Sequence, residues 1–159
     1  MKGKRLAGDR TVGRLVKWLR MLGIPCALLA VKTPGDVPED LLLLTRATSL
    51  AGPRTLLIPY EKPADQLRFV FKELPYLWEE IRPFTLCLLC NERLLEIAKE
   101  EVFGLVPEHV FRTQDKFRRC PRCGRIYWPG SHHKLMRKRL EQVLGCSLTA
   151  GQGGSAKRS

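Results

Sequence analysis

The chain has 159 residues, 44% of them hydrophobic, which is enough for one ordinary core or for a small domain with a smaller appendage. Lys and Arg total 28 against 16 Asp and Glu, a net charge of +12 that favours a polyanionic partner over a neutral one. A membrane is the weaker alternative, because no basic amphipathic helix flanked by Trp and Phe is present and the longest apolar run, Ile24 to Val31, is too short to span a bilayer.

Residues 5–80 alternate between helix and strand patterns. Apolar residues recur at helical spacing from Val12 to Leu22, and Gly23 ends this segment. A second helix is predicted from Pro63, with an apolar face turned to the core. Strands are predicted at Arg5–Gly8, Ile24–Val31, Leu41–Thr45 and Arg54–Tyr60. This alternation predicts a three-layer α/β domain with a mostly parallel sheet.

The loop from Lys32 to Asp40 is short for a connection between parallel strands. Such a crossover usually needs a dozen or more residues and most often contains a helix. This loop contains Pro34, Gly35 and Pro38, and can hold a single helical turn. Either the crossover is minimal, or the strands that flank the loop are not parallel neighbours.

Residues 81–145 differ in character from the first 80. They contain two Cys-x-x-Cys pairs, a short predicted helix around Glu92–Glu101, a basic run, and a final helix from about His133 to Leu144. Beyond Gly145 the chain is rich in Gly, Ser and Lys, which predicts disorder. We therefore expect an α/β domain over 1–80, a zinc-binding unit over 81–145 and a disordered tail over 146–159.

Cys87 with Cys90, and Cys120 with Cys123, form the two pairs. Each pair can form a tight knuckle, and two knuckles complete a tetrahedral zinc site with no open position, so a structural zinc is predicted. The alternatives are four unrelated buried thiols, or a redox pair, although neither pair opens a helix directly after an early strand. No signal peptide is visible, so we expect a cytoplasmic protein, and in that reducing compartment disulfides are uncommon.

A basic surface is predicted over the C-terminal part of the chain. Ten Lys and Arg lie between Val110 and Leu140, and Asp115 is the one acid that opposes them. Basic groups neutralise phosphates and aromatic faces stack on unpaired bases, a combination that favours single-stranded or looped RNA. The alternative is a solvated face with Tyr127 and Trp128 packed against the zinc knuckle. The candidate RNA contacts, including those of the first helix, are Arg10, Arg14, Lys17, Arg46, Arg118, Arg119, Arg122, Tyr127, Trp128, His132, Arg137 and Lys138.

Several motifs, in chain order, resemble the Mut-seven C-terminal RNase domain family. They are Asp9 followed by the segment Gly13 to Gly23, then Leu44-Thr45-Arg46, Gln66-Leu67, Cys87-x-x-Cys90-Asn91, and Cys120-Pro-x-Cys123-Gly124-x-Ile126-Tyr127-Trp128-x-Gly130-Ser131-His132. Together they extend over nearly the whole chain to Gly145, and the last is the most specific. The resemblance implies a PIN-like α/β domain fused to a zinc ribbon, with metal-dependent ribonuclease activity.

The resemblance also implies a set of acidic residues at the carboxyl ends of the strands, which hold Mg²⁺ or Mn²⁺. Asp9 matches the first of them, although its position also allows it to be the N-cap of the following helix. Where the family has Thr-Arg-Asp, this chain has Ala47 in place of the acid. Asp36, Glu39 and Asp40, in the shortened loop, are candidate replacements that the motifs do not align.

These features lead to three hypotheses. The favoured one is an RNA-binding protein of this family, with a structural zinc and with nuclease activity weakened or lost. The second is an active metal-dependent endoribonuclease that uses Asp9 with acids of the loop. The third is an interaction module that docks on a ribonucleoprotein such as the ribosome.

Overall fold

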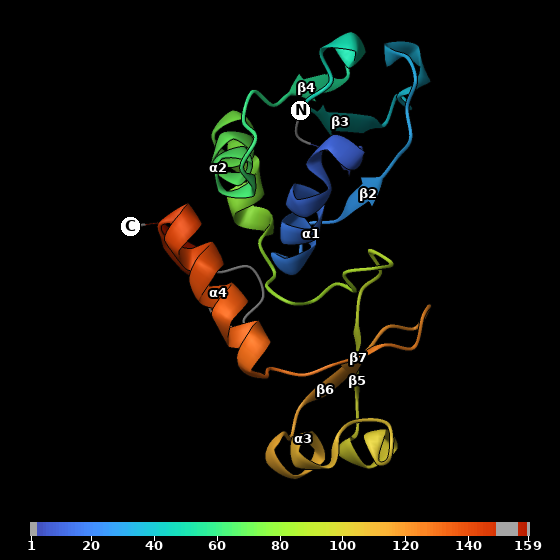
Figure 1. The fold of residues 1–159 in the computed structure, drawn as a ribbon, viewed down its shortest axis with the longest axis vertical. Coiled ribbons are helices and arrows are strands. Elements are labelled where there is room, and N and C mark those ends of the chain that lie inside the picture. The colour runs from blue at the N-terminus through green and yellow to red at the C-terminus, as the bar shows by residue number, and fades with distance from the viewer. Residues whose placement is uncertain (1–2, 149–155, 159) are drawn as a thin grey trace.

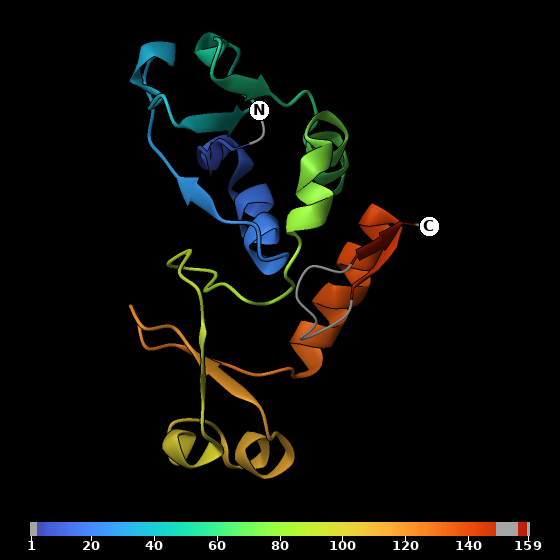
Figure 2. The ribbon, with the colours of Figure 1, turned by 180° about the vertical axis from the view of Figure 1, so that it is seen from behind.

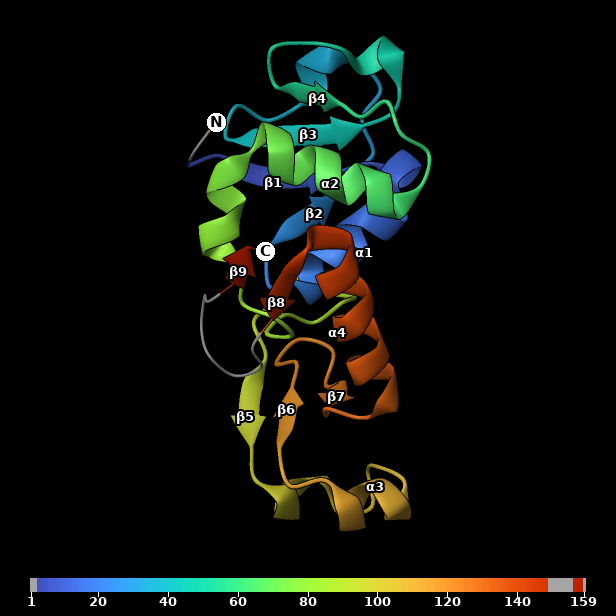
Figure 3. The ribbon, with the colours of Figure 1, turned by 90° about the vertical axis from the view of Figure 1, so that its left-hand side faces the viewer.

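The first part of the chain folds around a four-stranded parallel sheet. The computed structural model describes residues 3–148 and 156–158. Its first four strands are β1 (Arg5–Gly8), β2 (Cys26–Leu28), β3 (Leu41–Thr45) and β4 (Thr55–Leu57), and they lie in the order β2-β1-β3-β4 (Figures 1 and 3). Two helices, α1 (Gly13–Met21) and α2 (Pro63–Glu73), cover one face. The predicted α/β class with a parallel sheet is confirmed.

The strand order shows which strands the short loop before β3 connects. β1 lies between β2 and β3 and is parallel to both, with Leu6 opposite Cys26 on one side and Leu42 on the other. The chain leaving β2 thus skips one strand position, so β2 and β3 are not neighbours. Both explanations that the loop length allowed hold, because β2 and β3 are not neighbours and the connection between these parallel strands contains only the short turn Pro34–Asp36.

The sheet separates two apolar clusters, and the uninterrupted leucines of β3 belong to both. Every residue of β3 is buried, which is typical of a central parallel strand covered on both faces. Leu42 and Leu44 pack with α1 and α2, whereas Leu41 and Leu43 pack with Val37 on the opposite side. That opposite side is covered by loops with two short 3-10 turns, η2 (Pro34–Asp36) and η3 (Thr48–Leu50), so turns form the third layer in place of helices.

Gly23 ends α1 where another segment crosses closely. Its φ of 79° is in the left-handed region, which favours glycine. A Cβ placed on Gly23 would lie 1.9 Å from the backbone oxygen of Arg82. The Arg82 amide donates to the Leu22 oxygen at 2.7 Å, and the Phe84 amide donates to the Met21 oxygen at 2.7 Å. The end of α1 is therefore fixed to the segment that leads into the part of the chain with the four paired cysteines.

A second unit, which we call the zinc lobe (residues 84–130), contains an antiparallel sheet in the order β5-β6-β7. Its elements are β5 (Leu95–Ile97), η5 (Lys99–Val102), α3 (Glu108–Thr113), β6 (Phe117–Arg119) and β7 (Ile126–Tyr127). The helix predicted around Glu92–Glu101 is wrong. The first Cys-x-x-Cys turn folds the chain back on itself, with a bridge between Leu86 and Arg93, and this places Leu95–Ile97 against β6.

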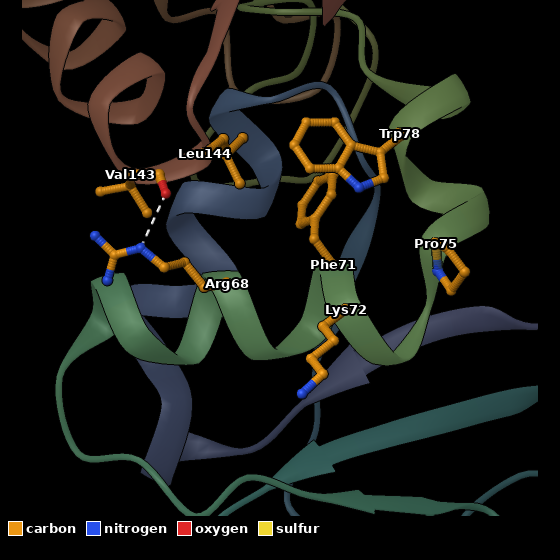
Figure 4. Close-up of a pocket in the computed structure, with 7 residues that line it drawn as sticks. All are labelled: Arg68, Phe71, Lys72, Pro75, Trp78, Val143 and Leu144. Atoms are coloured by element: carbon orange, nitrogen blue, oxygen red, sulfur yellow. Dashed lines mark hydrogen bonds between the residues drawn. The ribbon is translucent and has the colours of Figure 1, made fainter. Parts of the chain in front are cut away.

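The last helix, α4 (Ser131–Leu144), runs from the zinc lobe back to the α/β domain, where its C-terminal end meets α2 (Figures 1 and 2). Its Leu140 and Val143 are buried in the same cluster as α1 and α2. Arg68 of α2 donates through Nε to the Val143 oxygen at 3.0 Å, beside a pocket floored by Phe71 and Trp78 (Figure 4). Neither Asp9 nor a cysteine lines this pocket.

The predicted tail behaves differently from expectation in its first residues. Disorder was expected from Cys146 onward, but Cys146–Leu148 form strand β8, which pairs with β9 (Ala156–Arg158). Cys146 and Leu148 are also buried in the main core, which holds β8 in place. The rest of the expected tail, residues 149–155 and 159, lies outside the described residues. The domain boundaries at 80/81 and 145/146 stay predictions. Within the described ranges, no helix has the length and apolar character needed to cross a membrane.

Candidate metal centre and nucleic-acid interface

The two Cys-x-x-Cys turns have the same backbone structure. In the first, the Cys87 amide donates to the Glu92 oxygen at 2.8 Å, and the Asn91 amide donates to the Cys87 oxygen at 2.9 Å. In the second, the Cys120 amide donates to the Arg125 oxygen at 3.0 Å, and the Gly124 amide to the Cys120 oxygen at 2.9 Å. Each turn closes on a residue of positive φ, 61° at Asn91 and 78° at Gly124. Each is thus a knuckle that presents two sulfurs to one point.

The four sulfur atoms lie together as the sequence predicts. Cys87, Cys90, Cys120 and Cys123 have Sγ atoms that all lie within 4.8 Å of one another. The Cys87 and Cys123 Sγ atoms are 3.7 Å apart. A tetrahedral zinc with sulfur ligands at about 2.3 Å requires its sulfurs to be about 3.8 Å apart. Four cysteines at this spacing could hold a metal ion such as zinc.

Hydrogen bonds around the sulfurs favour their charged form. The Tyr127 hydroxyl lies 3.2 Å from Cys87 Sγ, and the Arg122 amide donates to Cys120 Sγ at 3.4 Å. Burial alone raises the pKa of the Cys87 thiol, but the Tyr127 hydroxyl and nearby backbone amides lower it to about 6. Desolvation and the three neighbouring thiols raise the pKa of Cys90 to about 12. A thiolate therefore forms readily at Cys87, whereas a second one at Cys90 is disfavoured unless a cation offsets its charge.

The first knuckle is docked on the α/β domain through Arg20 and Asn91. Arg20, buried at the end of α1, donates from Nε to the Cys26 oxygen at 2.9 Å and from Nη1 to the Leu88 oxygen at 2.8 Å. Asn91 accepts from the Cys26 amide at 3.0 Å through Oδ1. The knuckle and the start of β2 are therefore joined by a charged donor, Arg20, and an uncharged acceptor, Asn91. Sequence reasoning did not single out Arg20 and missed this role.

Asp9 follows β1 and is 7% exposed. Its Oδ1 accepts from the Thr11 amide at 3.0 Å and from the Thr11 hydroxyl, and its Oδ2 accepts from the Thr45 hydroxyl at 2.5 Å. Asp9 is the N-cap of the 3-10 turn η1 (Arg10–Val12), which runs into α1. This is the structural role that its position allowed. Both carboxylate oxygens already accept hydrogen bonds from uncharged groups.

The loop acids do not join Asp9. Asp40 forms an ion pair with Arg5 at the amino end of the sheet, and Lys4 donates to the Glu39 backbone oxygen at the same end. Asp9 lies at the opposite, carboxyl end of the sheet. A strand of about four residues separates the two ends, which is roughly 13 Å. Asp36 accepts from the Thr33 amide at 3.0 Å within η2. Among the residues described, Asp9 belongs to no group of three or more Asp, Glu, His or Cys side chains of metal-binding geometry.

Glu61 is an acid that sequence reasoning overlooked. Because β4 is parallel to β1 and β3, the residues that follow it lie at the same edge of the sheet as Asp9. Gln66 of α2 donates from Nε2 to the Tyr60 oxygen at 3.0 Å and to the Glu61 oxygen at 3.2 Å, which fixes this backbone. The Glu61 side chain is exposed. The sequence signal that could have identified Glu61 is its position directly after the predicted strand Arg54–Tyr60.

Two candidate RNA contacts have structural partners. Arg118 donates from Nη1 to the Phe84 oxygen at 2.8 Å. The Arg137 guanidinium lies 5.5 Å from the centre of the Phe84 ring and donates to the Leu148 oxygen at 3.4 Å. His133 lies against the same ring at 3.7 Å, and burial followed by the positive charge of Arg137 lowers its pKa to about 4. These side chains join α4 and β6 to Phe84, in the turn where the zinc lobe begins.

The two aromatic candidates also pack in the zinc lobe. The Tyr127 hydroxyl accepts from the Leu88 amide at 3.1 Å, beside the sulfurs. Trp128 lies 6.3 Å from Phe117 between ring centres, in the cluster behind β6 and β7. Both side chains are half-buried. Their geometry agrees with the alternative in which Tyr127 and Trp128 pack within the protein.

The remaining basic candidates are exposed. On the α/β domain, Arg10 and Arg46 flank the Asp9 network, where the Arg46 amide donates to the Thr11 hydroxyl at 2.9 Å. The exposed candidates are Arg10, Arg14, Lys17, Arg46, Arg119, Arg122, His132 and Lys138. Arg122 also forms a loose ion pair with Glu92, at 3.8 Å. These exposed side chains are available to a polyanion.

Comparison with known proteins gives one match. The sequence matches the Mut7-C RNAse domain over residues 4–140, which include Asp9, both knuckles and the start of α4. No curated protein and no solved structure matches the chain. The parallel sheet, the paired knuckles and this match over most of the sequence agree: the chain belongs to the Mut7-C RNAse domain family.

Proposed function

We propose that this protein binds RNA through its exposed basic side chains, is stabilised by one structural zinc ion, and has weak or no nuclease activity. The observation that supports the proposal most is the state of Asp9. Its two oxygens accept three hydrogen bonds from Thr11 and Thr45, and the loop acids lie elsewhere. Family membership supports contact with RNA, and the acidic site argues against efficient cleavage.

The acid site does not fit a dedicated Mg²⁺ or Mn²⁺ ion. Such an ion is usually bound through one or two carboxylates together with substrate phosphates and water. Here one buried carboxylate is already hydrogen bonded, and Ala47 supplies no second one. The exposed Arg10 and Arg46 beside it add positive charge, which disfavours a divalent cation and favours a phosphate.

The zinc proposal rests on the four sulfurs and on the identical turns that present them. We expect folded, reduced protein to contain about one zinc per chain by metal analysis. Replacing Cys87 or Cys120 by Ser should unfold the zinc lobe, because structural zinc contributes on the order of 10 kcal/mol to folding in small domains. Folded protein without zinc would contradict this assignment.

The proposed RNA surface extends over α1, the zinc lobe and the outer face of α4. Arg10, Arg14 and Lys17 recur on one side of η1 and α1. Arg20, on the last turn of α1, contacts the first knuckle, so this basic side leads toward the zinc lobe. Arg118 and Arg137 are excluded from the surface because their guanidinium groups bond backbone oxygens.

The test of RNA binding is charge reversal at exposed positions. Arg119, Lys134, Lys138 and Arg139 are changed to Glu, and binding to a stem-loop RNA is measured by fluorescence anisotropy over a range of salt. We expect at least a tenfold loss of affinity and a smaller dependence of affinity on salt, because fewer counterions are released.

A matched control separates location from net charge. Reversal of Arg5, Lys32, Lys62 and Lys72, which are also exposed but lie outside this surface, lowers the net charge by the same amount. This variant should retain most of the affinity. Equal losses in both variants would mean that binding depends on net charge alone, and unchanged affinity in the first variant would mean that the proposed surface is wrong.

The second candidate is an active endoribonuclease, and the position of Glu61 favours it. Glu61 and Asp9 both follow strands at the same edge of the sheet. A cation bridging them with an RNA phosphate would supply the charge that phosphodiester cleavage requires. Metal-dependent cleavage that is lost in both Asp9→Asn and Glu61→Gln would establish this candidate.

Location and partners complete the proposal. We propose a cytoplasmic protein, which is supported by the absence of disulfides among its six cysteines, all within the described part of the chain. Docking on a ribonucleoprotein such as the ribosome is compatible with the same basic surface. Binding to a ribonucleoprotein without binding to naked RNA would favour that alternative.

A further inference from the structure

The far end of the zinc lobe exposes apolar side chains among acids. Phe103 is 75% exposed and Leu105 58% exposed, in the turn between η5 and α3. The ring of Phe103 meets Phe111 edge-on, with 5.3 Å between centres, which holds it at the surface. Glu100 and Glu108 are exposed on either side of this turn. We call Glu100, Phe103, Leu105 and Glu108 the acidic tip.

The acidic tip contrasts in charge with the rest of the molecule. Residues 95–111 contain four Glu and one Lys, a net charge of −3 in a chain of +12, which leaves +15 on the remainder. RNA phosphates are repelled by the tip. Exposed Phe and Leu within a ring of carboxylates fit instead a protein surface that is apolar at its centre and basic around it.

The outer face of α4 has those properties. Leu135 is 67% exposed. Lys138 and Arg139 lie three and four residues further along, on the same side of the helix, and both are exposed. The opposite side of α4 is buried in the core through Leu140 and Val143. We call Leu135, Lys138 and Arg139 the basic α4 patch.

We propose that the acidic tip of one copy of this chain docks on the basic α4 patch of a second copy. Phe103 and Leu105 cover Leu135, and Glu100 and Glu108 face Lys138 and Arg139. The tip lies beyond β5 and β6, whereas α4 runs from the zinc lobe back toward α2, so the two surfaces occupy different parts of one molecule (Figure 3). The contact therefore joins unlike surfaces, and it either closes as a reciprocal two-fold pair or continues as a ring or chain of copies.

The contact has the physical character of a weak, salt-sensitive association. Removing the exposed apolar side chains from water stabilises it, and opposite charges around them align the two surfaces. Screening extends over about 10 Å at 0.1 M salt and about 3 Å at 1 M, so exposed charge pairs lose most of their attraction at high salt. Few side chains are involved, so association requires concentrated protein.

Sedimentation velocity of the full, zinc-loaded chain tests the proposal. The weight-average mass should rise above that of one chain with increasing concentration at about 50 mM salt, and return to one chain at about 1 M. The double variant Phe103→Ser/Leu105→Ser and the single variant Leu135→Ser should each remain monomeric. Leu28→Ser, an equally exposed leucine on β2, should associate like the native protein. Zinc content and unfolding midpoint confirm that each variant is folded.

Mixing the variants identifies the two surfaces as partners. The Leu135→Ser chain keeps its acidic tip, and the Phe103→Ser/Leu105→Ser chain keeps its α4 patch, so a mixture should regain association as pairs. Charge exchange supplies a second test, in which Glu100→Lys/Glu108→Lys and Lys138→Glu/Arg139→Glu are monomeric alone and associate when mixed. A native chain that stays monomeric at low salt, variants that associate normally, or mixtures that remain monomeric would each overturn the proposal.

Discussion

Asn91 closes the first knuckle where Gly124 closes the second, and the difference between the two residues has a physical cause. Both positions have positive φ, which Gly adopts freely and Asn tolerates better than most residues. The Asn91 side chain also accepts from the Cys26 amide, a bond that Gly cannot make. Asn91 therefore joins the first knuckle to the α/β domain. In the second knuckle, Gly124 has only to adopt the backbone conformation of the turn.

Two substitutions at Asn91 separate these properties. Asn91→Gly keeps the turn but leaves the Cys26 amide without its partner, and should lower the free energy of unfolding by about 1 kcal/mol. Asn91→Ala loses the same bond and adds the cost of a left-handed Ala, about 1 kcal/mol more. Urea unfolding of the zinc-loaded chain measures both. Equal stabilities of the two variants would show that the backbone conformation of Asn91 is not under constraint.

At the scale of the elements, helix α1 shows how local sequence and tertiary contacts combine. Its apolar spacing places Leu15 and Leu19 in the core, and its final turn is fixed by the crossing of the Arg82 segment over Gly23. The same helix offers a comparison between two glycines. Gly13, the first residue of the helix, has a φ of −54° and open space around an added Cβ. Gly23 has a positive φ and no space for a Cβ.

This comparison predicts opposite effects of Ala at the two glycines. Gly23→Ala should destabilise the protein by more than about 1 kcal/mol, because the new Cβ meets the Arg82 oxygen in a strained conformation. Gly13→Ala should stabilise it by about 1 kcal/mol or less, since Ala favours the helix. Thermal unfolding under identical zinc loading measures both. Similar midpoints for the two variants would contradict the close packing of the Arg82 segment on α1.

Local patterns predicted the elements that depend on local signals. The four leucines of β3 indicated a buried strand with the bounds that are observed, and the Cys-x-x-Cys spacing indicated two knuckles. The strand that replaces the helix predicted around Glu92–Glu101 depends on pairing with β6, a contact about twenty residues away along the chain. The roles of Arg20 and Arg118 depend on backbone oxygens of distant segments, which composition and spacing do not reveal.

At the scale of the whole molecule, charge and metal binding are distributed between the two units. The α/β domain contributes Asp9, with Arg10 and Arg46 beside it, at one edge of its sheet. The zinc lobe is held to this domain by Arg20 and Asn91, and α4 returns to pack its inner face on the main core. The exposed basic side chains therefore keep a fixed arrangement, which supports a binding surface better than a flexible basic tail would.

The measurement that tests the central claim most directly is RNA binding and cleavage in one sample. Native protein is incubated with stem-loop and unstructured RNAs in Mn²⁺, beside Asp9→Asn, and both the bound fraction and the RNA length are followed. We predict that RNA is bound and remains intact, equally in both proteins, and that Ala47→Asp raises the affinity for Mn²⁺ because it adds a carboxylate after β3. Efficient cleavage by the native protein that Asp9→Asn abolishes would contradict the account.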